Sequence, residues 1–127
     1  MPTYNIPIPP SVNHLWRHGR SWKGKPMTYR EPKYLTWLQM AGLKLKEQGM
    51  SLVLPPVRMV MRITGGRGWN RARDLDNGLK CVLDLLRQVG IIAEDNVQNL
   101  VDVRAVYEEN DRRDAVANCV VELETVK

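Results

Sequence analysis

The chain has 127 residues, of which 43% are hydrophobic, and it carries a formal net charge of +5 with a pI of about 9.5. This length and composition predict one globular domain over residues 1–127, which can fold unaided although dimerisation would add buried area. The basic excess permits nucleic-acid binding. The sequence contains neither a basic amphipathic helix with a bulky apolar face nor an apolar run that could cross a bilayer, so we expect no membrane partner.

The N-terminus and the two cysteines indicate the cellular compartment of the protein. The first residues lack the basic start and the continuous apolar run of a signal peptide. Cys81 and Cys119 form no CxxC motif, and no histidine cluster lies near them in the sequence. We therefore expect a cytoplasmic protein with reduced, buried thiols, because free cysteine commonly packs as a small hydrophobic residue.

The first half of the chain predicts a strand, a long loop and a helix. Apolar residues alternate with polar or proline positions over residues 4–8, which indicates an edge strand. Residues 9–30 are rich in proline, glycine and basic side chains, so we expect a long surface loop. Pro32 suits the first turn of a helix, and apolar residues then recur at helical spacing until Gly49 ends it.

In the second half of the chain, the spacing of the apolar residues changes twice. Residues 57–63 alternate with period two and predict a strand with one buried face, followed by a glycine-rich basic loop at residues 64–72. Residues 75–90 predict a helix with one apolar stripe, formed by Leu75, Leu79, Val82, Leu83, Leu86 and Val89. Alternation returns at residues 101–107 and 115–123. This order predicts a two-layer α+β domain in which two helices pack on a mixed four-stranded sheet.

Two carboxylates, Asp74 and Asp76, stand at the start of the second predicted helix. In an extended or barely helical segment, residues i and i+2 point the same way, so both face one small volume. Carboxylates that close repel each other unless a cation lies between them, and oxygen ligands suit a hard ion such as Mg²⁺. Arg67, Arg71 and Arg73 lie just upstream, and acidic groups in basic surroundings suit a phosphodiester substrate.

A third acidic position, Glu94 followed by Asp95, comes after this helix. The helix carries the chain about 20 Å from Asp76, at about 1.5 Å per residue. Residues 90–95 span a comparable distance if fully extended, at about 3.3 Å per residue. Asp95 therefore rejoins the first two carboxylates within one chain if residues 91–92 run back beside the helix, and otherwise a second chain supplies it.

Each of these residues also has an ordinary structural explanation. A carboxylate in the first turn of a helix caps it for about 1 kcal/mol, although capping needs only one of the pair. Lys80 is placed for an i,i+4 ion pair with Asp76 or Asp84, worth roughly a few tenths of a kcal/mol. Glu94 and Asp95 also fit a plain acidic turn. These alternatives stay open on the residues alone.

Basic residues in two predicted loops are candidates for contact with a nucleic acid. They are Arg17, Arg20, Lys23, Arg67, Arg71 and Arg73. The first three alternate with tryptophans that suit stacking on exposed bases, although tryptophans folded back into the core fit equally. The last three lie among glycines that let the backbone approach phosphates, although a solvated loop has the same composition. Phosphate contacts predict affinity that falls steeply with salt and depends little on base sequence.

Taken together, the residues between positions 73 and 104 follow one known pattern. They are Arg73-Asp74-Leu75-Asp76-Asn77, Lys80, Asp84, Leu86, Gly90, Glu94, Asp95 and Val97, with Pro9-Pro10-Ser11 and Asn13 near the N-terminus. This spacing resembles the RusA family of Holliday junction endonucleases. The resemblance implies a Mg²⁺-dependent homodimeric endodeoxyribonuclease that resolves four-way DNA junctions by paired symmetric nicks in recombination and repair.

The resemblance also implies a role for each acidic residue of the pattern. It makes Asp74, Asp76 and Asp95 the catalytic aspartates that bind the metal, and Lys80 the catalytic lysine. Asn77 and Glu94 would lie outside the set of metal ligands and support the positions of the ligands.

Gly78 departs from the expected pattern. It costs roughly 1 kcal/mol of helix propensity, and we expect it to let DNA or a partner chain approach closely. Two other functions remain open: a nuclease for flaps or other branched DNA, and a DNA-binding accessory module without catalysis.

Overall fold

The computed structural model describes residues 2–10, 16–20, 24, 26–70, 73–94, 96–112 and 114–126, with the backbone alone for residues 16–20, 26–30 and 77. The described strands and helices are β1 (Thr3–Ile6), β2 (Trp16–Arg20), β3 (Pro26–Arg30), α1 (Pro32–Glu47), β4 (Val57–Thr64), the 3₁₀ helix η1 (Leu75–Gly78), α2 (Leu79–Gln88), β5 (Leu100–Glu108) and β6 (Asn118–Thr125). None of the helices in these ranges is long and apolar enough to cross a membrane.

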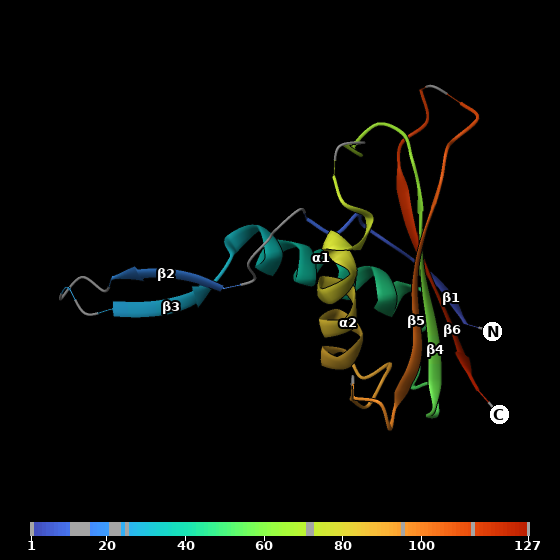
Figure 1. Ribbon diagram of the computed structural model, residues 1–127, viewed down its shortest axis with the longest axis horizontal. Helices are drawn as coiled ribbons and strands as arrows, with labels where there is room; N and C mark the ends of the chain where they lie inside the picture. The colour runs from blue at the N-terminus through green and yellow to red at the C-terminus, as the bar shows by residue number, and fades with distance from the viewer. Residues whose placement is uncertain are drawn as a thin grey trace.

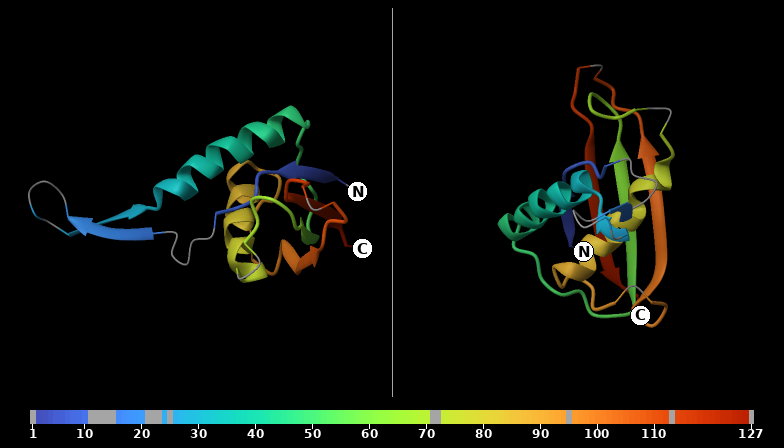
Figure 2. Two further views of the ribbon diagram at one scale, coloured as in Figure 1. Left: turned by 90° about the horizontal axis from the view of Figure 1, so that it is seen from above. Right: turned by 90° about the vertical axis from the view of Figure 1, so that its left-hand side faces the viewer.

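Four strands form a mixed sheet in the order β1-β6-β4-β5. β4 and β5 are parallel, whereas β6 pairs antiparallel with both β1 and β4. Both α1 and α2 lie on the same face of this sheet (Figures 1 and 2). The predicted α+β arrangement of two helices on a four-stranded mixed sheet is therefore confirmed.

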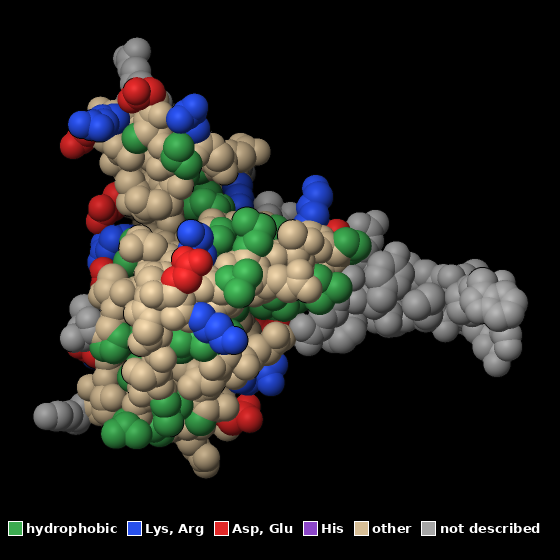
Figure 3. Space-filling view, turned by 180° about the vertical axis from the view of Figure 1, so that it is seen from behind, with side chains coloured by type: hydrophobic (Ala, Val, Ile, Leu, Met, Phe, Trp, Pro, Cys, Tyr) green, Lys and Arg blue, Asp and Glu red, His purple; other side chains and the backbone are tan. Residues whose placement is uncertain are grey.

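The outer side of α1 carries apolar side chains that its own chain does not cover. Leu35, Met40 and Leu43 are 41%, 53% and 63% exposed. Figure 3, which views the molecule from the side of α1, shows hydrophobic side chains gathered on this face. The opposite side of the helix buries Tyr34 and Leu45 in the core.

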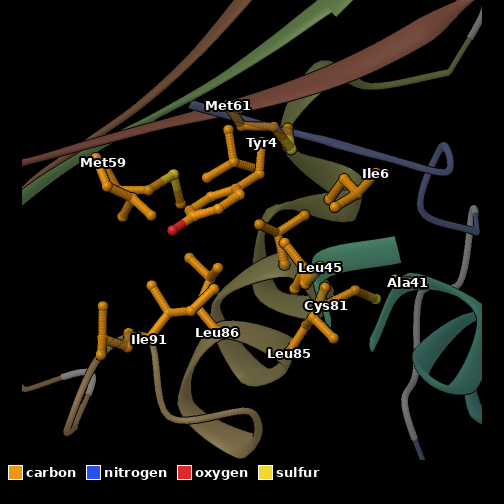
Figure 4. Packing of buried hydrophobic residues seen from close by; sticks show 14 of the residues in the cluster. Tyr4, Ile6, Ala41, Leu45, Met59, Met61, Cys81, Leu85, Leu86 and Ile91 are labelled. Carbon is orange, nitrogen blue, oxygen red and sulfur yellow. The ribbon is translucent and has the colours of Figure 1, made fainter. Parts of the chain in front are cut away.

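The core lies between the helices and the inner face of the sheet (Figure 4). The alternation predicted for β4 is confirmed, because Met59, Met61 and Ile63 are buried while the residues between them are partly exposed. In α2 the buried side chains include Leu85, which lies outside the predicted stripe. A wider arc is buried because α2 contacts both the sheet and α1, whereas a single stripe suits contact with one layer.

Charged residues occupy the other face of the sheet. Arg58 pairs with Asp102 at 2.9 Å and with Glu124 at 2.6 Å, and Arg62 pairs with Glu122 at 3.2 Å. Hydrogen bonds from Arg104 and Arg58 lower the pKa of the Asp102 carboxyl. These cross-strand pairs give the outer face its polar character and leave the apolar residues of β4 on the helix side.

Cys81 and Cys119 are free and buried, as predicted. Burial raises the pKa of Cys81 to about 11 and that of Cys119 to about 12. Both thiols therefore stay protonated at neutral pH, which makes them poor nucleophiles and poor metal ligands. Their role in this fold is packing.

The loop predicted for residues 9–30 is wrong in part. β2 and β3 pair antiparallel, from Trp16 opposite Arg30 to Arg20 opposite Pro26, and they form a hairpin that projects from the body (Figure 1). Period two marks a strand only where one of its faces is buried, and a projecting hairpin has no such requirement. The sequence pattern therefore carried no signal for these strands.

Candidate active site

The connection from β4 to β5 positions the predicted acidic residues. β4 and β5 run parallel and α2 lies between them in the chain, so α2 runs back along the sheet (Figure 1). η1 contacts β5 and lies at the end of the sheet where both strands finish. Asp74 immediately precedes η1 in an extended conformation, with φ −65° and ψ 135°, and Asp76 lies within η1. Both residues are exposed at the same end of α2.

The capping explanation is not supported for Asp74, although Asp76 lies in the first turn of η1 as that explanation requires. Asp74 stands at the N-cap of η1, but its side chain makes no capping hydrogen bond, and the N-cap of α2 is Gly78. Within the described ranges, neither Asp74 nor Asp76 takes part in an ion pair. Two exposed carboxylates therefore stand two residues apart without a protein partner there, which is the arrangement that a bound cation would relieve.

Lys80 lies in the first turn of α2 and is exposed. The predicted i,i+4 partner Asp84 is engaged elsewhere, because its carboxylate accepts hydrogen bonds from the hydroxyl of Tyr34 and from Arg87 at 2.6 Å. No ion pair of Lys80 occurs among the residues that the structure describes. Its ammonium group is thus available on the same helix end as Asp76.

The connection after α2 does not run back beside the helix. The N–H groups of Ile91 and Ile92 both donate to the carbonyl of Leu86, at 3.0 and 3.3 Å, and both side chains are buried. The N–H of Leu100 donates to the carbonyl of Asn96 at 2.8 Å, which folds that segment at the start of β5. Residues on both sides of position 95 are therefore held at the end of α2 remote from η1 (Figure 1).

The fold of residues 91–92 excludes one of the two arrangements expected from the sequence. Convergence within one chain required residues 91–92 to return along the helix, and they do not. Glu94 is exposed and belongs to the connection at the far end of α2, whereas Asp95 lies outside the described residues. Within the described ranges, which do not include Asp95, no three His, Cys, Asp or Glu side chains lie together as a metal ion would require.

Arg73, which directly precedes the acidic pair, packs against its own chain. Its guanidinium carbon lies 4.6 Å from the centroid of the Trp69 ring. Burial lowers the pKa of Arg73, and its Nε is buried without a hydrogen-bond partner in the described part of the chain. The cation–π contact holds the backbone next to Asp74 in place.

Gly78 has a different role from the one expected. A Cβ at this position would lie 2.5 Å from Cγ of Pro9 and 3.0 Å from Nη2 of Arg73. The expectation that Gly78 lets DNA or a partner approach is wrong, because Pro9 and Arg73 of the same chain fill that space. The missing side chain therefore allows the N-terminal segment to close over the start of α2.

Gly78→Ala should lower the free energy of unfolding by about 1–3 kcal/mol, because overpacking outweighs the gain of roughly 1 kcal/mol in helix propensity. Urea denaturation of the variant measures this change. Gly42→Ala in α1 is the matched control, since its Cβ would meet Cγ1 of Val89 at an ordinary 3.8 Å. This control should gain up to about 1 kcal/mol. Equal stabilisation by both substitutions would contradict the packing argument.

The structure describes the remaining predicted residues to different extents. Arg67 is exposed, and its Nε donates to the backbone carbonyl of Asp114 at 3.0 Å. Arg17 and Arg20 belong to β2 and Asn77 to η1, where the structure describes the backbone. Arg71 and Lys23 lie outside the described residues. DNA contact by these basic residues stays a prediction.

One feature of this end of the sheet was missed from the sequence. A pocket of about 420 Å³ opens between the segment after β4 and the end of β5, with Trp69 and Tyr107 among its lining residues. Their rings lie 6.0 Å apart at an angle of 31°. A tryptophan inside a glycine-rich basic loop was the available signal, but its partner stands far away in the sequence, on the third predicted strand.

Comparison with known protein families shows which family the chain belongs to. The family model described as Endodeoxyribonuclease RusA matches residues 7–117 of the 127 residues. The chain belongs to the RusA family. RusA membership identifies it as an endodeoxyribonuclease of the Holliday junction type and confirms the resemblance drawn from residues 73–104. No curated protein matches the chain.

Proposed function

We propose that this RusA-family protein resolves Holliday junctions in DNA recombination and repair by paired, symmetric, Mg²⁺-dependent nicks. The observation that carries the proposal is the pair of exposed carboxylates, Asp74 and Asp76, which make no cap and no ion pair within the described ranges. They lie in a protein of net charge +5, next to the segment that holds Arg67 and Arg73. Basic surroundings favour the approach of a phosphodiester backbone.

The donor set fits a hard divalent cation. Carboxylate oxygens are the ligands that Mg²⁺ prefers in sites that also bind a phosphate, and Asp74, Asp76 and Asp95 would supply them. When bound, Mg²⁺ supplies Lewis-acid stabilisation of the negative charge on the scissile phosphate. Asn77 and Glu94 would support the ligand positions.

Lys80 would act on the substrate itself. Its exposed ammonium group, one turn along the helix from Asp76, would donate hydrogen bonds either to the scissile phosphate or to the attacking water. Hydrolysis joins the water oxygen to phosphorus and breaks the bond from phosphorus to the leaving oxygen. A fixed positive charge stabilises the negative charge that develops in that step.

We also propose that Asp95 completes the acidic site of a partner chain in a homodimer. Support comes from the fold of residues 91–92 at the far end of α2 and from the hydrogen bond between Leu100 and Asn96. A twofold dimer also matches the symmetry of a four-way junction and delivers one nick on each of two strands. The exposed apolar side of α1, with Leu35, Met40 and Leu43, is a surface that a second copy would bury.

A nicking assay on a synthetic four-way junction, a flap and a linear duplex tests this function. With Mg²⁺ we expect paired nicks in the junction and little cleavage of the duplex. Chelation by EDTA should stop cleavage and leave junction binding in a gel-shift assay unchanged, because the carboxylates do not themselves hold the DNA. Preferential cleavage of the flap would favour a flap nuclease instead, and binding without any cleavage would favour an accessory module.

A further inference from the structure

The pocket between the segment after β4 and the end of β5 has the size of a ligand site. Its volume of about 420 Å³ lies within the range of about 300–1,000 Å³ that small-molecule pockets occupy. It opens at the end of the sheet where β4 and β5 finish, the same end as η1. Trp69 of its lining stacks with Arg73, the residue before Asp74. A ligand in this pocket would therefore contact Trp69, whose ring packs on the residue that precedes the acidic pair.

The inner lining of the pocket is aromatic. Trp69 and Tyr107 form an aromatic wall. The hydroxyl of Tyr107 lies beneath this wall, where it is buried without a hydrogen-bond partner in the described residues. It packs over Gly65, where any Cβ would collide with it. The glycine thus makes room for the tyrosine at this wall.

The rim of the pocket is polar, with two basic groups and one acidic group. Arg67, Arg112 and Glu109 are exposed there, and Asn110 adds an amide that can both donate and accept hydrogen bonds. Guanidinium groups bind phosphate oxygens with charge-assisted hydrogen bonds. An aromatic wall inside with an amide and guanidinium groups at the mouth matches a nucleobase that is still attached to its phosphate.

We propose that this pocket takes up an unpaired base from the strand that the Asp74–Asp76 site cuts, an inference that rests on the proposed nuclease function. Unstacking a base from intact duplex is costly, and the cost is least where the base is already unpaired or poorly stacked, as at a branch point. The pocket would therefore favour junctions over linear duplex without reading base sequence. It supplies a source of structural selectivity that the acidic residues alone do not provide.

A junction carrying 2-aminopurine next to the branch point tests the proposal. This base fluoresces weakly when stacked, so its uptake into the pocket should raise the fluorescence when the protein binds. The Asp74→Asn background in EDTA removes cleavage from the measurement. Arg112→Ala should raise the protein concentration needed for half of the rise about tenfold, because losing a charge-assisted hydrogen bond weakens binding by about that factor.

Arg104→Ala is the charge-matched control. Arg104 lies on the outer face of the sheet, where it pairs with Asp102, and its side chain is 63% exposed. It should leave the fluorescence rise intact, whereas Arg112→Ala should not. Tyr107→Phe keeps the ring that would stack on the base and should leave the rise intact. The near-ultraviolet circular dichroism of the Arg112 variant should match the parent, which separates loss of binding from loss of fold.

Two results would overturn the inference: no fluorescence rise at any position around the branch, or equal losses in the Arg112 and Arg104 variants. Equal losses would mean that the arginines act only through general electrostatic attraction. Failure of the nuclease function gives a different pattern, because the unsubstituted protein would then lack cleavage with Mg²⁺ while the fluorescence rise persisted. The two outcomes are distinguishable since the fluorescence measurement needs no cleavage.

Discussion

Asp74→Asn should abolish nicking of a four-way junction while leaving junction binding unchanged or stronger. Asparagine keeps the shape of the side chain but removes one of two negative charges at the start of α2, so a divalent cation is held less well. Loss of several kcal/mol of charge stabilisation lowers the cleavage rate by about 10³-fold or more. Binding persists because a negative charge that faced the phosphate backbone is gone.

Glu47→Gln is the matched control for this experiment. Glu47 ends α1, is exposed, and pairs only weakly with Lys44 at 3.7 Å on an exposed surface. The substitution changes net charge by the same amount away from η1 and should leave nicking at the parent rate. Single-turnover cleavage of a labelled junction measures the rate, and a gel shift measures binding. Undiminished nicking by Asp74→Asn would remove the aspartate from the proposed site.

Much of the fold could be predicted because most elements bury one face. In β4 the buried residues stand at every second position, so the sequence carries the register directly. The hairpin of β2 and β3 imposes no such alternation and was predicted as a loop. The role of Gly78 was also beyond local reasoning, since the atoms that require its missing side chain belong to Pro9, far back in the chain.

The candidate site could likewise be predicted only in part. Asp74, Asp76 and Lys80 fall within one short segment, so their spacing alone placed them at one end of a helix. The relation of Asp95 to this group depends on how the connection folds, and sequence distance allowed either geometry. The pocket wall joins Trp69 to Tyr107 through the pairing of β4 with β5, a long-range contact that no local pattern encodes.

Mixed dimers should recover activity that neither parent variant has, if a partner chain supplies Asp95. In a heterodimer of Asp74→Asn with Asp95→Asn chains, one site receives both substitutions and the other receives neither. With random assembly, half of the dimers are mixed and each mixed dimer has one intact site. About a quarter of all sites should therefore be intact. Because each mixed dimer cuts one strand, the product should be singly nicked junction rather than resolved duplexes.

Co-expression of the two differently tagged variants, followed by tandem purification, isolates these heterodimers for the nicking assay. The control pairs Asp74→Asn with Asp76→Asn, whose heterodimer has a damaged acidic pair in both sites and should stay inactive whichever chain supplies Asp95. If each site were built within one chain, the first mixture would stay as inactive as the control. The hydrogen bonds that hold Ile91 and Ile92 at the far end of α2 predict recovery in the first mixture alone.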